Sequence, residues 1–251
     1  MYLRDSKFLI CCAARTGSTY LVHLLRSNPE VLCHGEVIDL SGVGALAGSY
    51  ALLRQESAEF ELLLQKKLIE NPERFIYDNI FDGQTRKVVG FKFKTDELFD
   101  PRYARYKDIL ATDTDIKVIH LVRKNLLDQY ISHQVVLKQT GVTLLHSDAA
   151  APQIHPFSCD IEHALAYFED VIQRERLAAD FYAKHRSISV SYEGLQDQSQ
   201  NDREVIQLFL GVTVLPLDSS TKKIIRDSRE LLINLEDTLS ALSDAGFSDR
   251  I

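Results

Sequence analysis

Short apolar runs alternate along the chain with longer segments in which apolar residues recur at helical spacing. The apolar runs predict strands over residues 7–12, 88–94, 116–122 and 187–191, with a further short strand directly after residue 31. Helical spacing and helix-boundary residues predict helices over 18–27, about 56–70, 125–138, 160–184, 201–210 and 220–242. Strands that alternate with helices favour an α/β fold, with a central parallel sheet flanked by helices and a ligand site at the carboxyl ends of the strands.

Two segments interrupt this alternation. Residues 31–48 hold the short strand, a predicted turn over Cys33 to Glu36 and a glycine-rich loop, which we expect at the rim of the active site. Residues 141–159 contain glycine and prolines and predict a flexible loop that faces the substrate. The chain has 251 residues and 45% hydrophobic content, enough for one sizeable core, so we expect a single domain over residues 1–251.

The composition narrows the classes of function. The net charge is -7 and the basic residues are dispersed, which gives no support for binding nucleic acid. The four cysteines lack the paired spacing of a zinc site, and no cluster of Asp, Glu and His has metal-ligand spacing. Because there is neither a secretory signal nor an apolar run approaching about 18 residues, we expect no stable membrane insertion and a cytoplasmic location. Apolar residues of the predicted C-terminal helix pack within the chain or form a homodimer: Leu231, Leu232, Leu235 and Leu239.

The most informative chemistry lies where the first strand meets the first helix. The strand ends at Cys12, and the turn that follows opens an amphipathic helix. Free backbone N–H groups at a helix N-terminus, together with the helix macrodipole, favour an anion. Arg15 adds a permanent positive charge with a planar donor fork, and hydroxyl donors follow it. The turn is therefore a predicted phosphate site formed by Arg15, Thr16, Gly17, Ser18, Thr19 and Tyr20.

The P-loop of ATP and GTP enzymes is the main alternative for this turn. Its pattern places a glycine where this chain has Cys12 and a lysine where it has Ser18. A basic residue followed by a small residue, glycine and hydroxyls resembles instead the 5′-phosphosulfate loop of sulfotransferases that use 3′-phosphoadenosine 5′-phosphosulfate (PAPS). The resemblance implies a single-domain, P-loop-like three-layer fold. It also implies PAPS as co-substrate, released as 3′,5′-diphosphoadenosine, and no metal.

Two later segments resemble the same family in the same order. In 122–132 a basic residue precedes Ser132, as in the 3′-phosphate motif of the family. The family spacing fits Lys124, whereas the position directly after the apolar strand favours Arg123, so both are candidates. Residues 189–195 and 205–212 are similar to the strand of the family that ends in Tyr-Glu-Asp-Leu and the helix that ends in Phe-Leu-Gly. This similarity implies that Tyr192 lies close to the adenine, and a buried structural tyrosine is the alternative.

The catalytic base is where the chain departs from the cytosolic sulfotransferases. Lys92 and Lys94 resemble a strand in which those enzymes have a lysine and, two residues later, a catalytic histidine, so Lys94 stands in place of the histidine. Glu36 resembles the glutamate of bacterial carbohydrate sulfotransferases, which include trehalose, lipopolysaccharide and nodulation-factor enzymes. Glu36 is the predicted base, with His34 as the alternative. Lys92 or Lys94 is expected at the sulfuryl oxygens and Arg15 at the leaving phosphate.

The resemblance implies in-line transfer of the sulfuryl group of PAPS to a hydroxyl of a carbohydrate, glycolipid or small metabolite. The acidic chain argues against a polyanionic acceptor, because like charges repel along an extended groove. Two alternatives from other classes stay open. A P-loop-type nucleotide kinase would share the strand, loop and helix, and a non-catalytic nucleotide-binding relative would keep the fold without the chemistry.

Overall fold

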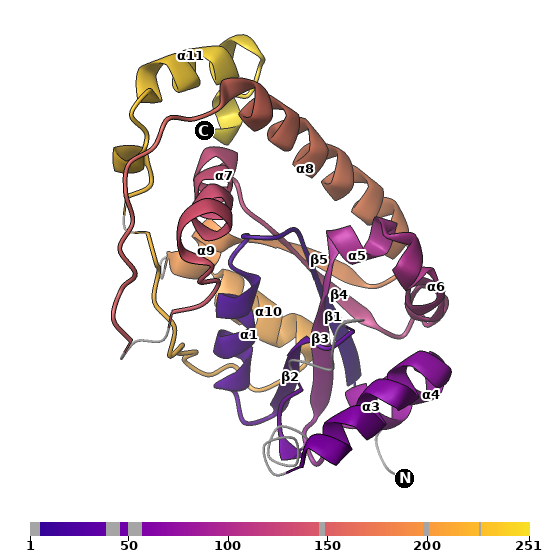
Figure 1. Ribbon diagram of the computed structural model, residues 1–251. Helices are drawn as coiled ribbons and strands as arrows, with labels where there is room; N and C mark the ends of the chain where they lie inside the picture. Colours follow the sequence, from indigo (N-terminus) through magenta and orange to yellow (C-terminus); the bar gives the residue numbers. More distant parts are fainter. Residues whose placement is uncertain (1–5, 39–45, 50–56, 146–148, 198–200, 226) are drawn as a thin grey trace.

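Five parallel strands form the centre of the molecule (Figure 1). A computed structural model describes residues 6–38, 46–49, 57–145, 149–197, 201–225 and 227–251. The strands follow the order β2-β3-β1-β4-β5 and span β1 (Ser6–Cys12), β2 (Val31–Glu36), β3 (Val88–Lys94), β4 (Lys117–Val122) and β5 (Ser187–Ser191). Strand β1 pairs on both sides, and Phe8 through Cys12 are all buried, as expected for a central parallel strand. The predicted α/β fold and the predicted strands are confirmed.

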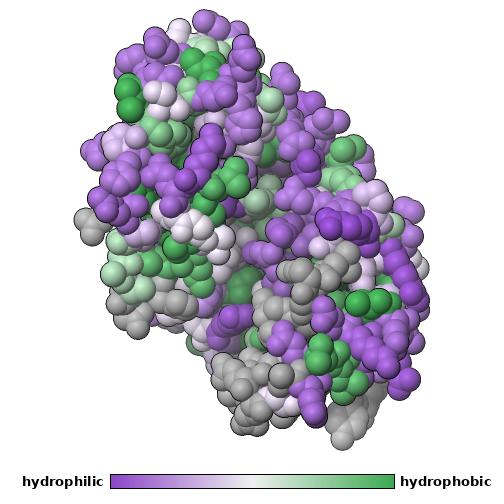
Figure 2. All heavy atoms as spheres, viewed as in Figure 1, coloured by the Kyte–Doolittle hydropathy of each residue, from purple (hydrophilic) through white to green (hydrophobic). Residues whose placement is uncertain are grey.

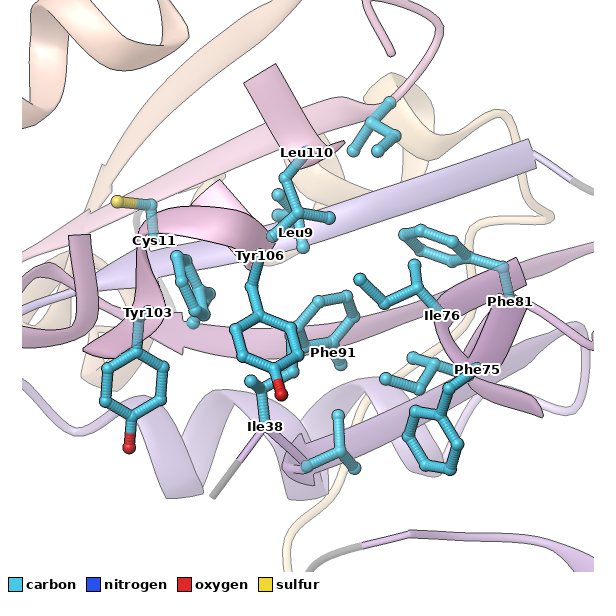
Figure 3. Packing of buried hydrophobic residues seen from close by; sticks show 14 of the residues in the cluster. Leu9, Cys11, Ile38, Phe75, Ile76, Phe81, Phe91, Tyr103, Tyr106 and Leu110 are labelled. Atoms are coloured by element: carbon cyan, nitrogen blue, oxygen red, sulfur yellow. The ribbon is translucent and has the colours of Figure 1, made fainter. Parts of the chain in front are cut away.

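Helices cover both faces of this sheet. Alternate residues of β1 point to opposite faces, so Phe8 and Ile10 belong to one core and Leu9 and Cys11 to the other. On the first face pack α1 (Ser18–Arg26) and α10 (Asp202–Leu210). The second core is rich in aromatic rings (Figure 3). Its helical segments include α3 (Ala58–Glu70), α4 (Pro72–Phe75), the π-helical η1 (Ile76–Ile80) and α6 (Ala104–Thr112).

A third core joins helices near the top of Figure 1. It is formed by α7 (Leu126–Val135), α8 (Ile161–Tyr182) and α11 (Leu235–Asp244). The apolar residues of the C-terminal segment pack into this core. Helix α7 continues as the π-helical η3 (Val136–Thr140), and Gly141, with φ 62°, ends it. The remaining short helices are α5 (Thr95–Phe99), η2 (Pro101–Tyr103), α9 (Tyr192–Gln196), η4 (Arg229–Leu231) and η5 (Ser248–Arg250).

The predicted helix over 220–242 is wrong. Only η4 and α11 are helical there, and the described residues between 217 and 228 are irregular. Leu232 forms a bridge with Phe157, and the side chain of Asn234 bonds both backbone groups of Cys159. Backbone and side-chain bonds to the 157–159 segment thus replace helical ones, because they allow Leu232 to be buried.

The predicted turn over Cys33 to Glu36 is also wrong, because β2 continues to Glu36. A shift in register between Cys33 and Glu36 lets the strand reach Lys92 of β3. The glycine-rich loop predicted after it falls largely on residues 39–45, which lie outside the described residues. In the segment 141–159, the described residues form no helix, and Phe157 makes the bridge named above.

Candidate active site

The turn between β1 and α1 has an unusual backbone. Arg15 and Gly17 have φ 63° and 80°, the left-handed region that non-glycine residues rarely adopt. Thr16 is fully buried, and its hydroxyl donates to the carbonyl of Ala13 at 2.9 Å, which braces the turn. In the described part of the chain no side chain caps α1, which leaves the N–H groups of its first turn without a capping acceptor there. The local geometry therefore provides the helix N-terminus that an anion site requires.

The ring of Tyr192 covers this turn. A Cβ added at Gly17 would lie 2.7 Å from Cε2 and 3.2 Å from Cγ of Tyr192, so only glycine leaves room for the ring. The guanidinium of Arg123 lies over the same ring, 4.9 Å from its centroid. Tyr20 approaches it edge-on, with ring centroids 6.4 Å apart. Tyr192 thus joins the turn, α1 and the end of β4 around one aromatic ring.

Two arginines and Ser132 meet beside the turn. Arg15 Nε donates to Ser132 Oγ at 3.0 Å, and Arg15 Nη1 donates to the carbonyl of Thr143 at 3.1 Å. Arg123 Nη1 donates to the carbonyl of Arg15 at 3.3 Å, and its Nη2 pairs with Asp128 at 3.2 Å. Burial and the neighbouring Arg123 together hold the pKa of Arg15 below its ordinary value. An anion between the two guanidinium groups would relieve their repulsion.

The structure distinguishes the two basic candidates after β4. Arg123 is buried and lines the cavity described below, and its Nε is buried without a hydrogen-bond partner among the described residues. Lys124 is exposed and is not among the residues that line this cavity. Its backbone N–H donates to the carboxylate of Glu193 at 3.0 Å. Of the two, Arg123 has the geometry to meet a ligand.

Glu36 lies in a network of charges at the ends of β2 and β3. Its carboxylate contacts Lys92 Nζ at 2.5 Å and Lys94 Nζ at 2.9 Å. Lys94 Nζ is also 3.6 Å from Glu97, and Lys92 Nζ donates to Ser18 Oγ at 3.2 Å. Burial opposes ionisation of Glu36, but the two ammonium groups outweigh it and hold its pKa below the ordinary value. Burial raises the pKa of Glu97 to about 7.

His34 does not reach the cavity. It is fully buried, its Nδ1 accepts the N–H of Ala47 at 2.9 Å, and its Nε2 lies 3.0 Å from the carbonyl of Ile80. Burial lowers the pKa of His34 to about 4. Because both ring nitrogens are occupied and the ring has no access to solvent, the structure gives His34 a packing role and disfavours it as the base.

One cavity of about 680 Å³ collects the other candidates except Thr16, which is fully buried and is not among the residues that line it. Its wall includes Glu36, Lys92, Lys94, Ser132, Tyr192 and most of the 15–20 turn. Residues 143–145, which belong to the loop predicted to face the substrate, also line it. Residues that were not predicted as part of the site complete the wall: Asp128, Arg203 of α10 and most of the irregular residues 217–225, with Ser228. The sequence did not indicate that the segment 217–228 belongs to the site, because most of it was predicted to be helical.

The cavity is cationic although the chain is acidic. Seven basic side chains line it, namely Arg15, Lys92, Lys94, Arg123, Arg203, Lys222 and Lys223, against the carboxylates of Glu36, Asp128 and Asp218. The whole chain has a net charge of -7. Figure 2 shows that the face in view is mainly hydrophilic, with apolar residues in small separate groups. The excess of positive charge is therefore concentrated where a polyanion would bind.

The described part of the chain contains no group of His, Cys, Asp and Glu that would hold a metal ion. It also contains no helix that combines the length and the apolar character needed to cross a bilayer. All four cysteines are buried free thiols.

Comparisons with known proteins identify the fold. No model of a protein family matches the sequence, and no curated protein matches it. Among solved structures, the sulfotransferase domain from the curacin biosynthetic pathway is similar with a TM-score of 0.55 and 16% identity, over 85% of this chain and 77% of that one. A sulfotransferase from Alicyclobacillus acidocaldarius gives a TM-score of 0.47 and 16% identity, over 97% and 96% of the two chains. The first likeness shows that this chain has the fold of that domain.

Proposed function

We propose that the protein is a PAPS-dependent sulfotransferase that acts on a hydroxyl of a carbohydrate, a glycolipid or a small metabolite. The observation that carries the proposal is the cationic cavity built around the 15–20 turn, in a chain that is otherwise acidic. The donor carries phosphate at two separate positions. The cavity offers the N–H groups of the turn with Lys92 beside Ser18, and next to them Arg15 and Arg123, with Ser132 bonded to Arg15.

The residues present suit such a donor. Gly17 leaves room for the ring of Tyr192 directly against the turn, so the residue proposed to contact the adenine lies beside the anion site. Arg123 retains a buried Nε without a partner, which a phosphate oxygen would satisfy. Arg15, Thr16, Gly17, Ser18, Thr19 and Tyr20 would hold the 5′-phosphosulfate, Arg123 and Ser132 the 3′-phosphate, and Tyr192 the adenine. In this proposal Lys124 has no direct contact, because its side chain is exposed.

When bound, the donor supplies the sulfuryl group. The acceptor oxygen forms a bond to sulfur while the bond from sulfur to the phosphate oxygen breaks, and the electron pair of that bond remains on the phosphate oxygen. Arg15 and the N–H groups of the turn stabilise the negative charge that grows on this oxygen. Lys94 stabilises the sulfuryl oxygens, and Lys92, beside Ser18, stabilises the donor phosphate. Glu36 accepts the proton of the acceptor hydroxyl, which contributes about 10²–10⁴-fold to the rate.

The acceptor class follows from the same charges. Glu36 lies at the end of the cavity formed by β2 and β3, beside Lys94, which is its second ammonium partner. A hydroxyl of a neutral molecule reaches this carboxylate without adding charge. A highly sulfated polymer would meet the acidic surface of the chain outside the cavity. We therefore propose a neutral glycan, a glycolipid or a small hydroxylated metabolite as acceptor.

Calorimetric titration tests the donor site directly. Wild type should bind 3′,5′-diphosphoadenosine and prefer it to ATP with Mg²⁺. Arg15→Ala and Ser132→Ala should weaken that binding, the first by at least about tenfold, because each removes a hydrogen bond to a charged group. Arg176→Ala, at an exposed position of α8, serves as the matched control.

The outcomes separate the three candidate functions. Preference for ATP with Mg²⁺ would favour a nucleotide kinase and contradict the proposal. Binding of the bisphosphate without transfer to any acceptor in a glycan and metabolite panel would favour a non-catalytic relative. Transfer of label from PAPS to an acceptor, lost in Glu36→Gln, would support both the reaction and the base.

A further inference from the structure

Lys92 contacts both Glu36 and the first residue of α1, Ser18. Its side chain is 7% exposed, and its Nζ lies 2.5 Å from the Glu36 carboxylate and 3.2 Å from Ser18 Oγ. Ser18 is the first residue of α1, directly after the turn, so the ammonium already stands between that turn and the carboxylate. One buried cation therefore adjoins both the position of the donor and the group that would accept the acceptor proton.

We propose that Lys92 neutralises Glu36 in the absence of the donor and turns to the donor phosphate when the donor binds, which leaves Glu36 available as a base. The inference rests on the proposed function of the cavity. It makes the binding order compulsory: the donor binds first, and only then does the acceptor meet a competent carboxylate.

The charges around Glu36 support this exchange. From β3 it faces two ammonium groups, Lys92 and Lys94, from α5 the carboxylate of Glu97 and from β1 the buried thiol of Cys12. A carboxylate held by two ammonium groups is a weak base, because a proton must compete with both of them. When one ammonium group moves away, the Glu36 carboxylate becomes a stronger base, as proton transfer from the acceptor hydroxyl requires.

The two lysines differ in what holds them. Lys94 has a second carboxylate, Glu97, at 3.6 Å, and the backbone N–H of Lys94 donates to the same residue at 2.8 Å. Among the contacts described for Lys92, the only other partner is the neutral hydroxyl of Ser18. Lys92 thus exchanges one anion for another, whereas Lys94 is held in place by Glu97. This difference makes Lys92 the transferable cation and Lys94 the matched control.

A double-mutant cycle on binding of 3′,5′-diphosphoadenosine tests the exchange without any acceptor. If the ligand must take Lys92 from Glu36, Glu36→Gln should tighten binding by about tenfold, the effect of one half-buried ion pair. In a Lys92→Met background, the same Glu36→Gln change should alter the affinity by less than about twofold. In a Lys94→Met background, the tightening should persist.

Each result decides one question. Equal tightening in the wild-type and Lys92→Met backgrounds would reduce the effect to long-range repulsion and overturn the exchange. If Glu36→Gln alone does not tighten binding of the bisphosphate, the exchange is overturned as well. This result decides the question even if Lys92→Met fails to fold. If the bisphosphate binds neither wild type nor any variant, the proposed function fails. If it binds without the coupling, only the exchange fails.

Discussion

Gly17→Ala is the sharpest test of the site as the structure builds it. The substitution adds one methyl group at a residue with φ 80°, directly under the ring of Tyr192. Two effects follow. The backbone takes a conformation that is unfavourable for any residue with a Cβ, and the ring must move away from the turn, because the new carbon would lie 2.7 Å from its Cε2.

The two effects separate by comparison with Gly246. That residue has φ 88°, and a Cβ added there meets nothing within 4 Å. Gly246→Ala therefore has only the backbone cost, about 1–2 kcal/mol. Gly17→Ala adds the loss of the contact between Tyr192 and Arg123 and of the edge contact with Tyr20, together about 1–3 kcal/mol. The melting temperature should fall further by about 2–4 °C for each of these kcal/mol.

Thermal unfolding and calorimetry on both variants complete the test. Gly17→Ala should melt below Gly246→Ala and bind 3′,5′-diphosphoadenosine at least about tenfold more weakly than wild type, because Arg123 loses its support. Gly246→Ala should bind as wild type does. The reasoning fails if the two variants melt together, or if Gly17→Ala retains wild-type affinity, since the ring would then not depend on the glycine.

Three further predictions concern neighbouring groups. Because burial raises the pKa of Glu97 to about 7, the folded state holds a proton that the unfolded chain releases near pH 4.5, and this contribution to stability falls as the pH rises between those values. The free energy of unfolding of Glu97→Gln, measured in urea, should therefore rise by on the order of 1–3 kcal/mol relative to that of wild type as the pH goes from about 5 to about 7.5. A constant difference between the two proteins over this range would contradict the prediction. His34→Gln should lose about 1–3 kcal/mol of stability and keep its bisphosphate affinity, because the hydrogen bonds of His34 within the described residues go to the backbone of Ala47 and Ile80. Unfolding at the wild-type urea concentration would exclude the packing role. Arg203→Lys should weaken bisphosphate binding about 3–10-fold, whereas Arg176→Lys should not, because a single ammonium replaces a guanidinium that bonds Tyr20, Leu195 and Leu217.

The strands were predictable from the sequence because parallel strands covered on both faces are continuous apolar runs. Phe8 through Cys12 are buried whichever face they point to, so the pattern does not depend on details of packing. The helices with their own boundary signals, α3 with Ser57 as N-cap and α8 with Asp160, were predictable for a similarly local reason. The end of α7 was not, because the π-helical extension to Thr140 has no separate signal in the sequence.

Part of the site was predictable by topology. In a parallel sheet the carboxyl ends of the strands share one edge, so Arg15, Lys94 and Arg123 had to lie near one another once the strands were known. Their pairing was not predictable. The contacts of Glu36 with two lysines depend on the register shift in β2, and the burial of His34 depends on the carbonyl of Ile80. Both are consequences of tertiary packing between segments far apart in the sequence.

The irregular segment 217–228 matters to the site because it is anchored at both ends by groups that also serve the cavity. Arg203 Nη1 donates to the carbonyl of Leu217 at 3.2 Å while its Nη2 donates to Tyr20, the residue that meets the edge of Tyr192. At the other end, the hydroxyl of Ser228 donates to Asp128, whose second oxygen pairs with Arg123. A continuous helix over 220–242 would instead satisfy its backbone groups within the helix. The extended segment instead links the ring of Tyr192 at one end to Arg123 at the other, and these two groups are already stacked on each other. The described residues of this wall are therefore tied at both ends to groups of the candidate donor site, which makes the wall part of that site.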